Sequence, residues 1–268
     1  LIQIGYNSFP ELNSQVAHAM AFIFRNKKVQ NYKGIYIDLN TDRGINEDKN
    51  LVYLEKKDKK KKYINTCEEF LNIPNNIIAY NCSKRMKLLL TSSKSITNHS
   101  DFIGSFNKTA DNEKYLRYSW EVNNNQIGMY RKWCMYSKGG NFRKYYGNLE
   151  NIVDWSDEAR EFYKNNKTSN LLDKKYWYKE GITYNLITTL GSSFRYLPKE
   201  CISDMGGPTI YDVDDIDYAI GFLNSKVSYK FLTILNPTIN VQVKDIKNIP
   251  YLYDKTMKNK IIILVKEN

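Results

Sequence analysis

The spacing of apolar residues predicts short strands separated by polar loops. In "KGIYIDL" (33–39) every second residue is apolar, which is the period of a strand with one buried face. The apolar run within "QVAHAMAFIFR" (15–25) predicts another strand, and "GITYNLITTLGSSFRYLP" (181–198) predicts a strand, a turn and a second strand. Alternation near the end of the chain adds a strand within "NPTINVQVKDIKNIPY" (236–251).

Three segments carry the pattern of helices. The segment "LVYLEKKDKKKKYINTCEEFLN" (51–72) predicts one helix, or two helices broken by the lysine run. "DEAREFYKNN" (157–166) begins with acidic residues, as the helix dipole favours. The clearest helix is "DVDDIDYAIGFLNSKVSYKFLTIL" (212–235), whose apolar residues recur on one face. Its leading aspartates lack the glycine and glutamate of a calcium loop, so we interpret them as helix capping.

Interspersed strands and helices predict an α+β fold, and 268 residues can form one or two domains. The longest apolar runs are too short to cross a bilayer and no secretion leader opens the chain, so we expect a cytoplasmic protein without a membrane partner. Four widely spaced cysteines and two histidines give no metal-ligand pattern, so no metal site is expected. The chain opens without Met, which suggests a piece of a longer protein.

The charge balance favours a polyanionic partner. Forty Lys and Arg against 29 Asp and Glu give a formal charge of +11, which is typical of nucleic-acid binding. Lysine outnumbers arginine 32 to 8, as expected from an AT-rich genome, so arginine is the more informative cation, and five of the eight arginines lie between residues 117 and 195. The run "KKDKKKK" (56–62) could bind phosphates, but a solvated helix face or a linker is the simpler interpretation.

One segment concentrates this chemistry. Residues 122–149 contain five Lys or Arg and no acid, and "KGGNFRKYYGN" (138–148) within them combines cations, rings and paired glycines. Gly139 and Gly140 would let the backbone approach phosphates or would form an ordinary hairpin turn. Aromatic residues at this spacing are more often core than stacked on bases, so we expect about two of three to lie inside. The rings concerned are those of Trp133, Phe142, Tyr145 and Tyr146.

Motifs that run a reaction are missing from the sequence. It contains no GxxxxGK[ST] phosphate loop, no GxGxxG after a strand and no GxSxG elbow. The Asn-Pro-Pro-aromatic loop with which amino methyltransferases hold a flipped adenine is also absent. We therefore expect no catalytic residue in this chain and no activity from the chain alone.

Six segments, in the same order, resemble the C-terminal half of the adenine-specific DNA methyltransferases of BREX phage-defence systems, the PglX type, which are related to the fused type IIG restriction–modification enzymes. They are "IGYNSFPELNSQVAHAMAFIFRN", "KTADNEKYLRYSWEV", "KWCMYSKGGNFRKYYGNLENIVDW", "KEGITYNLITTLGSSFRYLP", "MGGPTIY" and "GFLNSKVSYKFLTILNPTINVQVKDIKNIP". The resemblance covers essentially the whole chain, and the six segments together are far more specific than any one of them.

The resemblance implies a division of the chain. Residues 1–45 would be the last strands of the S-adenosylmethionine-dependent catalytic domain, residues 46–74 a helical, lysine-rich linker, and residues 75–268 the DNA target recognition domain. The cofactor would bind the full-length bacterial enzyme upstream, so none is expected in this chain. In "KTADN" (108–112), Ala110 stands where a glycine is typical, which argues against a role that needs positive φ there.

The implied function is sequence-specific recognition of double-stranded DNA for N6-adenine methylation, in phage defence and host self-marking. Affinity would come from cations on phosphates, and specificity from contacts in a groove. The residues expected on the DNA-facing surface are Arg131, Lys138, Gly139, Gly140, Asn141, Arg143, Lys144, Tyr146 and Arg195. A second group is Lys108, Asn112 and Arg117, for which a solvated loop is the alternative. Asn148 and Gln242 are further candidate base readers.

Expected partners are double-stranded DNA, the upstream methyltransferase domain and other BREX proteins. An alternative from another class is a protein-interaction module that docks other defence proteins or an acidic phage inhibitor, because basic, aromatic-rich surfaces serve that purpose too. A pull-down that survives nuclease treatment would favour this alternative over DNA recognition.

Overall fold

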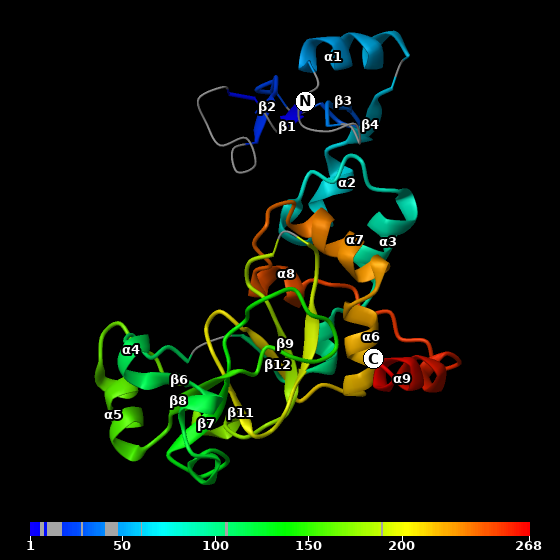
Figure 1. Ribbon diagram of the computed structural model, residues 1–268. Coiled ribbons are helices and arrows are strands. Elements are labelled where there is room, and N and C mark those ends of the chain that lie inside the picture. Colours follow the sequence, from blue (N-terminus) through cyan, green and yellow to red (C-terminus); the bar gives the residue numbers. More distant parts are fainter. Residues whose placement is uncertain are drawn as a thin grey trace. The chain divides into compact units, whose positions relative to one another are not determined.

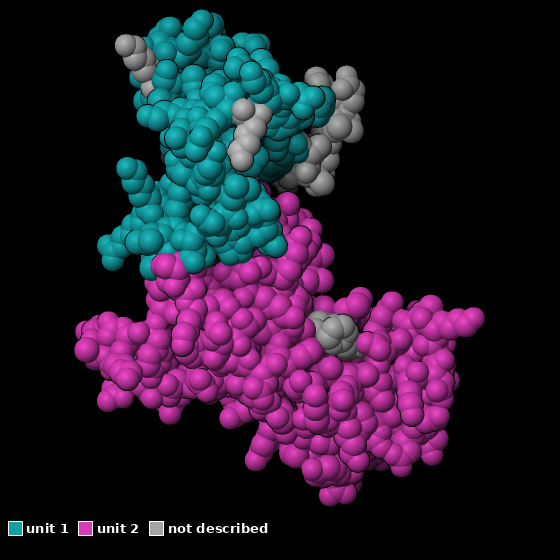
Figure 2. Space-filling model, turned by 180° about the vertical axis from the view of Figure 1, so that it is seen from behind, with its two compact units in different colours: residues 1–91 teal, residues 92–268 magenta. Residues whose placement is uncertain are grey.

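The computed structural model describes residues 1–5, 8–9, 18–27, 29–40, 48–59, 61–104, 107–188 and 190–268. The chain has an α+β fold, as the sequence predicts. It divides into two compact units, residues 1–91 and residues 92–268, which we call unit 1 and unit 2 (Figure 2). The division of the sequence into a catalytic-domain segment, a linker and a target recognition domain stays a prediction.

Unit 1 is built on a mixed sheet with the strand order β2-β1-β3-β4. β1 and β3 run parallel, whereas β2 pairs antiparallel with β1 and β4 pairs antiparallel with β3. The strands are β1 (Ile2–Gly5), β2 (Ala19–Ala21), β3 (Lys33–Asp38) and β4 (Tyr63–Thr66). The helices are α1 (Lys49–Asp58), α2 (Glu68–Leu71), the 3₁₀ turn η1 (Pro74–Asn76) and α3 (Lys84–Ser92), whose last residue belongs to unit 2.

The predictions for unit 1 are partly right. β3 confirms the strand over 33–39. Of the strand expected over 15–25, three residues form β2, and the positions before His18 lie outside the described residues. Of the two alternatives for 51–72, a single helix is wrong, and the two expected helices are present as α1 and α2, but the chain between them also forms β4. Register explains this: Tyr63 pairs with Tyr36 on β3, so the segment extends the sheet.

Aromatic rings fill the core of unit 1. Tyr36 on β3 stacks on Tyr80, with ring centroids 5.4 Å apart, and meets Phe70 of α2 edge-on at 5.6 Å. All three side chains are buried. These contacts join one face of the sheet to α2 and to the segment that follows it, and they bury a large apolar area in a small unit.

Unit 1 also exposes apolar side chains directly after β2. Phe22, Ile23 and Phe24 are 54%, 97% and 74% exposed, and the two phenylalanine rings lie 4.5 Å apart. Single exposed apolar residues are ordinary, but a consecutive run next to an edge strand is typical of a surface that another protein segment covers.

Unit 2 contains two four-stranded sheets, with the orders β10-β9-β12-β5 and β11-β7-β8-β6. The strands are β5 (Phe102–Gly104), β6 (Leu116–Tyr118), β7 (Trp133–Ser137), β8 (Asn151–Asp154), β9 (Gly181–Tyr184), β10 (Phe194–Leu197), β11 (Cys201–Ser203) and β12 (Thr209–Tyr211). The α-helices are α4 (Asn112–Tyr115), α5 (Asp157–Asn165), α6 (Ile216–Leu223), α7 (Lys226–Leu235), α8 (Val243–Lys247) and α9 (Lys258–Lys266). The 3₁₀ turns are η2 (Ile96–His99), η3 (Ser119–Glu121), η4 (Asn124–Gln126) and η5 (Lys174–Tyr176). Antiparallel pairing of β9 with β10 confirms the strand, turn and strand predicted over 181–198.

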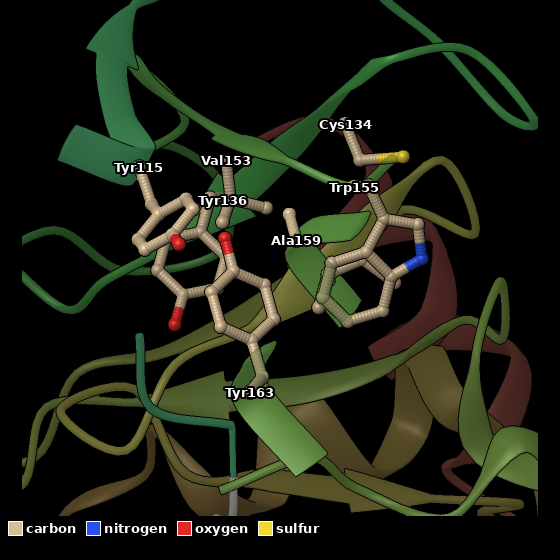
Figure 3. Packing of buried hydrophobic residues seen from close by; sticks show 8 residues of the cluster. Tyr115, Cys134, Tyr136, Val153, Trp155, Ala159 and Tyr163 are labelled. Carbon is tan, nitrogen blue, oxygen red and sulfur yellow. The ribbon is translucent and has the colours of Figure 1, made fainter. Parts of the chain in front are cut away.

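An aromatic cluster packs α5 against the sheet β11-β7-β8-β6 (Figure 3). Tyr115, Tyr136, Trp155 and Tyr163 are all buried there, and Tyr163 donates its hydroxyl proton to the carbonyl oxygen of Asp154 at 2.8 Å. Ser156 caps α5 and acidic residues occupy its first turn, which confirms the helix predicted over 157–166.

The single helix predicted over 212–235 is instead two helices, α6 and α7. Asn224 lies between them, and its side chain accepts from the Phe194 amide at 3.0 Å and donates to the Phe194 carbonyl at 2.8 Å. Ser225 then begins α7, because its hydroxyl oxygen accepts from the Ser228 amide at 3.2 Å. The helix is therefore interrupted at Asn224, whose side chain bonds to β10.

The interpretation of the aspartates before α6 as helix caps is wrong for Asp215. It stands at the N-terminal cap with φ of 50°, but its carboxylate accepts no bond from the helix. Instead the carboxylate lies 2.6 Å from Lys258 and accepts from the Tyr253 hydroxyl at 2.7 Å. Asp217 lies 3.4 Å from Lys266, so two ion pairs join α9 to α6, beside which it lies (Figure 1).

The strand expected near residue 241 is also wrong. Asn240 forms an isolated bridge with Ile187, and the chain then enters α8 at Val243. Gln242 begins this helix, since its amide donates to the carboxylate of Asp245 at 3.2 Å. A reciprocal cap thus overrides the alternating apolar pattern.

Candidate nucleic-acid interface

Residues 138–148, called the basic loop, leave β7 and are fixed beside β10. The Tyr145 amide donates to the Phe194 carbonyl at 2.9 Å, and the Tyr196 amide donates to the Tyr145 carbonyl at 2.8 Å. Because β10 is an edge strand, these bonds satisfy peptide groups that its own sheet leaves open. The loop is therefore held through its backbone, which leaves its side chains available for other contacts.

Arg195 holds the basic loop from the interior. Its side chain is fully buried, and its guanidinium donates to the carbonyl oxygens of Arg143 at 3.3 Å and Ser193 at 3.1 Å. It also donates to the side-chain oxygen of Asn185 at 2.8 Å, and the Asn185 amide group donates to the Gly140 carbonyl at 2.7 Å. Two polar side chains of the β9–β10 region thus fix two carbonyl groups of the loop.

Burial changes the pKa of Arg195 without removing its charge. Together with the neighbouring Arg143 it lowers the pKa of Arg195 to about 10, against a smaller opposing effect of Glu150. The group stays protonated at neutral pH, so neutral carbonyl and amide oxygens compensate its positive charge. Arg195 therefore lies in the interior, and not on the surface where the sequence placed it.

The exposed side chains of the basic loop are those of Asn141, Phe142, Arg143, Lys144 and Tyr146. Arg143 lies 3.7 Å from the carboxylate of Glu150, and both side chains are about half exposed. Lys144 donates to the Asn224 carbonyl at 3.1 Å, and Lys138 is half-buried. The loop thus presents two adjacent cations, one of which an acid partly neutralises.

The paired glycines serve close packing between two loops. Gly139 and Gly140 adopt φ of 83° and 113°. A Cβ at Gly139 would lie 2.8 Å from the Gly206 carbonyl oxygen, and one at Gly207 would lie 2.8 Å from the Ser137 carbonyl oxygen. The backbone of the neighbouring loop therefore occupies the space that a side chain at Gly139 or Gly207 would need.

The second predicted group lies in an ordered turn. Lys108 and Asn170 exchange two backbone hydrogen bonds of 2.9 Å, and the side-chain oxygen of Asn112 accepts from the Thr109 hydroxyl at 2.9 Å. Arg117 is half-buried, and its guanidinium donates to backbone carbonyl groups. Lys108 and Asn112 are exposed, so a DNA contact by this group stays a prediction, with a solvated loop as its alternative.

Ala110 corrects one expectation. It adopts φ of 64° in an exposed turn, although its side chain argues against positive φ. The next residue, Asp111, caps α4 by accepting from the Lys114 amide at 3.0 Å. The turn that delivers this cap requires the left-handed conformation whichever residue occupies it.

The remaining candidate contacts are scattered. Arg131 is exposed in the turn before β7. Asn148 is buried, and its side chain donates to the Asn141 carbonyl at 2.8 Å, so it shapes the loop from inside. Gln242 is exposed at the start of α8.

The four rings are divided between core and surface. Trp133 is 8% exposed and Tyr145 is half-buried, but Phe142 is 39% and Tyr146 is 60% exposed. The expectation that most of these rings lie inside is wrong for Phe142 and Tyr146, because the loop attaches through peptide groups instead of ring packing.

Sequence reasoning missed the residues that shape this surface. Asn185 and Asn224 contact the basic loop, but in the sequence they are polar residues at the ends of apolar elements, like many turn residues. Tyr118 and Trp120 are 48% and 70% exposed, and no pattern of spacing distinguishes them from core aromatics.

Other kinds of site lack support in the described residues. Among them, no group of three or more His, Cys, Asp or Glu side chains is arranged to hold a metal ion. Burial raises the pKa of Cys134 to about 11 and that of Cys201 to about 12, so both are protonated thiols at neutral pH. No helix in the described part of the chain is long and apolar enough to cross a membrane.

Known proteins align with nearly the whole chain. It is 25% identical over 283 residues to the adenine-specific methyltransferase PglX of Lacticaseibacillus casei, which covers 93% of this chain and 22% of that protein. The chain is thus similar to PglX-type methyltransferases along nearly its whole length. It is also 25% identical over 273 residues to the adenine-specific methyltransferase BrxX of Escherichia coli, which covers 97% of this chain and 22% of that protein.

These alignments confirm the resemblance to the PglX type found in the sequence. The chain spans about a fifth of the length of these relatives, with 22% of each covered. No protein-family model matches it.

Proposed function

We propose that this chain is the DNA-recognition part of an adenine-specific DNA methyltransferase, with residues 75–268 as its target recognition domain. The observation that carries the proposal is the basic loop, on which Arg143 and Lys144 are exposed. The backbone of the loop is fixed by the peptide groups of Tyr145 and by the side chain of Arg195. The alignment to adenine-specific methyltransferases over nearly the whole chain supports it.

The chemistry of adenine methylation calls for such a surface. The N6 atom is paired inside the duplex, so the base must leave the stack, and the enzyme must grip the surrounding DNA while this happens. Cations on phosphates supply affinity, and side chains in a groove supply sequence preference.

The candidate side chains divide between these two tasks. Arg131, Lys138, Arg143 and Lys144 would contact phosphates or guanine, and the exposed Asn141 is a candidate reader of adenine. Arg195 acts differently from the expectation, as a residue that positions the loop from inside.

Residues 1–45 would belong to the catalytic domain. The parallel pair of β1 and β3 is typical of sheets that continue into a larger α/β domain. The exposed run Phe22–Phe24 lies next to the edge strand β2, where a further part of the methyltransferase would cover it. S-adenosylmethionine would bind the full-length enzyme, whose methylation would mark host DNA in a cytoplasmic bacterial phage-defence system.

Titration of a labelled DNA duplex at two ionic strengths tests the proposal. For about four phosphate contacts, we expect affinity to fall roughly 100-fold between about 50 and 200 mM salt. Absence of binding at low salt would contradict DNA recognition by this chain. Protein capture that survives nuclease treatment, without DNA binding, would favour the protein-interaction alternative.

A further inference from the structure

Two exposed aromatic rings form a flat stacked pair on unit 2. The rings of Tyr118 and Trp120 are 4.6 Å apart between centroids and 5° from parallel. Trp120 is 70% exposed, whereas Trp133 and Trp155 are 8% and 2% exposed. A tryptophan this open leaves most of its ring in water at a cost to folding, so its position suggests a role in binding.

The backbone holds the pair in place before any ligand arrives. Tyr118 ends β6, the edge strand of its sheet, and pairs with Asn151. The Ser119 amide donates to the Glu150 carbonyl at 2.9 Å. The Tyr118 amide donates to the carboxylate of Glu121 at 2.6 Å, which directs this acid back to the turn. A ligand that stacks on Trp120 therefore meets a preformed surface.

The pair lies next to the basic loop. Glu150 makes the connection, because its carbonyl oxygen accepts from Ser119 beside the pair while its carboxylate lies 3.7 Å from Arg143 of the loop. The turn that carries the pair and the basic loop thus both contact Glu150. The carboxylate of Glu150 partly neutralises the positive charge of Arg143.

A nucleobase fits this surface better than an apolar protein segment. The residues that follow the pair in the chain, "EVNNNQ" (121–126), are mostly polar, which favours a polar ligand with a flat face over an apolar protein segment. Proteins that bind unpaired nucleic acid combine cations along the backbone with aromatic rings on which bases stack, and every base offers a flat face to such a ring. Inside an intact duplex those faces are covered, and extrusion of an adenine uncovers them.

We propose that the Tyr118–Trp120 pair stacks against a nucleobase that becomes unstacked when the target duplex is opened. The inference rests on the proposed function and deepens it, because it names the chemical group that this part of the surface takes. Phosphate contacts by the basic loop would place the opened strand, and the rings would hold one of its uncovered bases.

Two matched DNA ligands test the inference on the intact chain. One is a fully paired duplex, and the other is the same duplex with a single unpaired adenine. We expect wild type to prefer the second, and we expect Trp120→Ala to lose that preference by roughly 5- to 150-fold, the range measured for single base–ring stacks. Trp120→Phe should keep most of it. Tyr229→Ala, on the 45% exposed Tyr229 of α7, is the control and should behave like wild type.

The outcomes separate the two proposals. Equal affinity of wild type for both ligands, or an unchanged preference in Trp120→Ala, overturns the stacking role while leaving DNA recognition intact. If Trp120→Ala weakens the binding of both ligands equally, the stacking role is also overturned, because the ring would then contact DNA without regard to an unpaired base. Failure of wild type to bind either DNA overturns the proposed function and the stacking role with it. Quenching of tryptophan fluorescence by the unpaired ligand, lost in Trp120→Phe, would support direct contact.

Discussion

At the scale of single residues, Arg195 is the side chain on which the basic loop depends most. A buried guanidinium needs its hydrogen-bond partners, because an unpaired buried charge costs several kcal/mol. Here the partners include the Arg143 carbonyl and the side chain of Asn185, which itself holds the Gly140 carbonyl. The conformation of the loop and the burial of Arg195 therefore stabilise each other.

Replacement of Arg195 tests this coupling. Arg195→Met removes the charge but leaves acceptors unpaired, so we expect a loss of about 2–4 kcal/mol in the free energy of unfolding. Arg195→Lys keeps the charge but loses the planar guanidinium group, so its free energy of unfolding should lie between those of wild type and Arg195→Met. Chemical denaturation measures the loss, and a duplex titration should show weakened binding in both variants. Wild-type stability in Arg195→Met would contradict the coupling.

Ala110 is a position where a substitution should stabilise the protein. Its left-handed backbone costs an L-residue roughly 1–2 kcal/mol, and glycine removes that cost while adding entropy to the unfolded chain. We expect Ala110→Gly to raise the free energy of unfolding by about 0.5–1 kcal/mol in thermal or chemical denaturation. The comparison is Ala159→Gly inside α5, which should destabilise by about 1 kcal/mol or more because its backbone is helical and its buried methyl group is lost. Equal destabilisation by both substitutions would show that the backbone at Ala110 carries no such cost.

At the scale of elements, the sequence predicts those whose determinants are local. β3 follows from alternation, and α5 follows from a serine cap with acids in the first turn. The break between α6 and α7 does not follow from local signals, because the bonds of Asn224 to Phe194 join residues far apart in the chain. In the candidate site, the exposed Arg143 and Lys144 stand out as cations in an acid-free segment. The burial of Arg195 depends on tertiary contacts that spacing does not encode.

The contact between α6 and α9 predicts a dependence of stability on pH. Hydrogen bonds from Lys258 and Tyr253 lower the pKa of Asp215. A carboxyl whose pKa is lower in the folded chain adds stability above its unfolded pKa, and this is lost as pH falls through the folded pKa. We expect Asp215→Asn, which tolerates the same left-handed backbone, to lower Tm slightly at neutral pH and to match wild type in strong acid. A difference in Tm that does not change with pH would contradict the ion pair as its cause.

At the scale of the whole molecule, unit 1 exposes apolar side chains that do not pack into its own core. Ile23 and Phe24 contribute little to its core at 97% and 74% exposure. We expect Ile23→Ser with Phe24→Ser to leave thermal stability nearly unchanged and to reduce self-association in sedimentation experiments. A large loss of stability would mean that these side chains belong to the fold of unit 1, and would remove the support they give to a covering methyltransferase domain.

Binding of DNA phosphates by the basic loop is the central claim, and the salt dependence of duplex binding tests it most directly. Arg143→Ala with Lys144→Ala removes two cations while the backbone bonds of Tyr145 and Arg195 remain possible. The matched control is Lys167→Ala with Lys199→Ala, which removes two exposed cations elsewhere on unit 2. We expect the slope of log affinity against log salt to fall by about 1.8 in the loop variant and to stay at the wild-type value in the control. An unchanged slope in the loop variant, or an equal fall in both, would contradict the central claim.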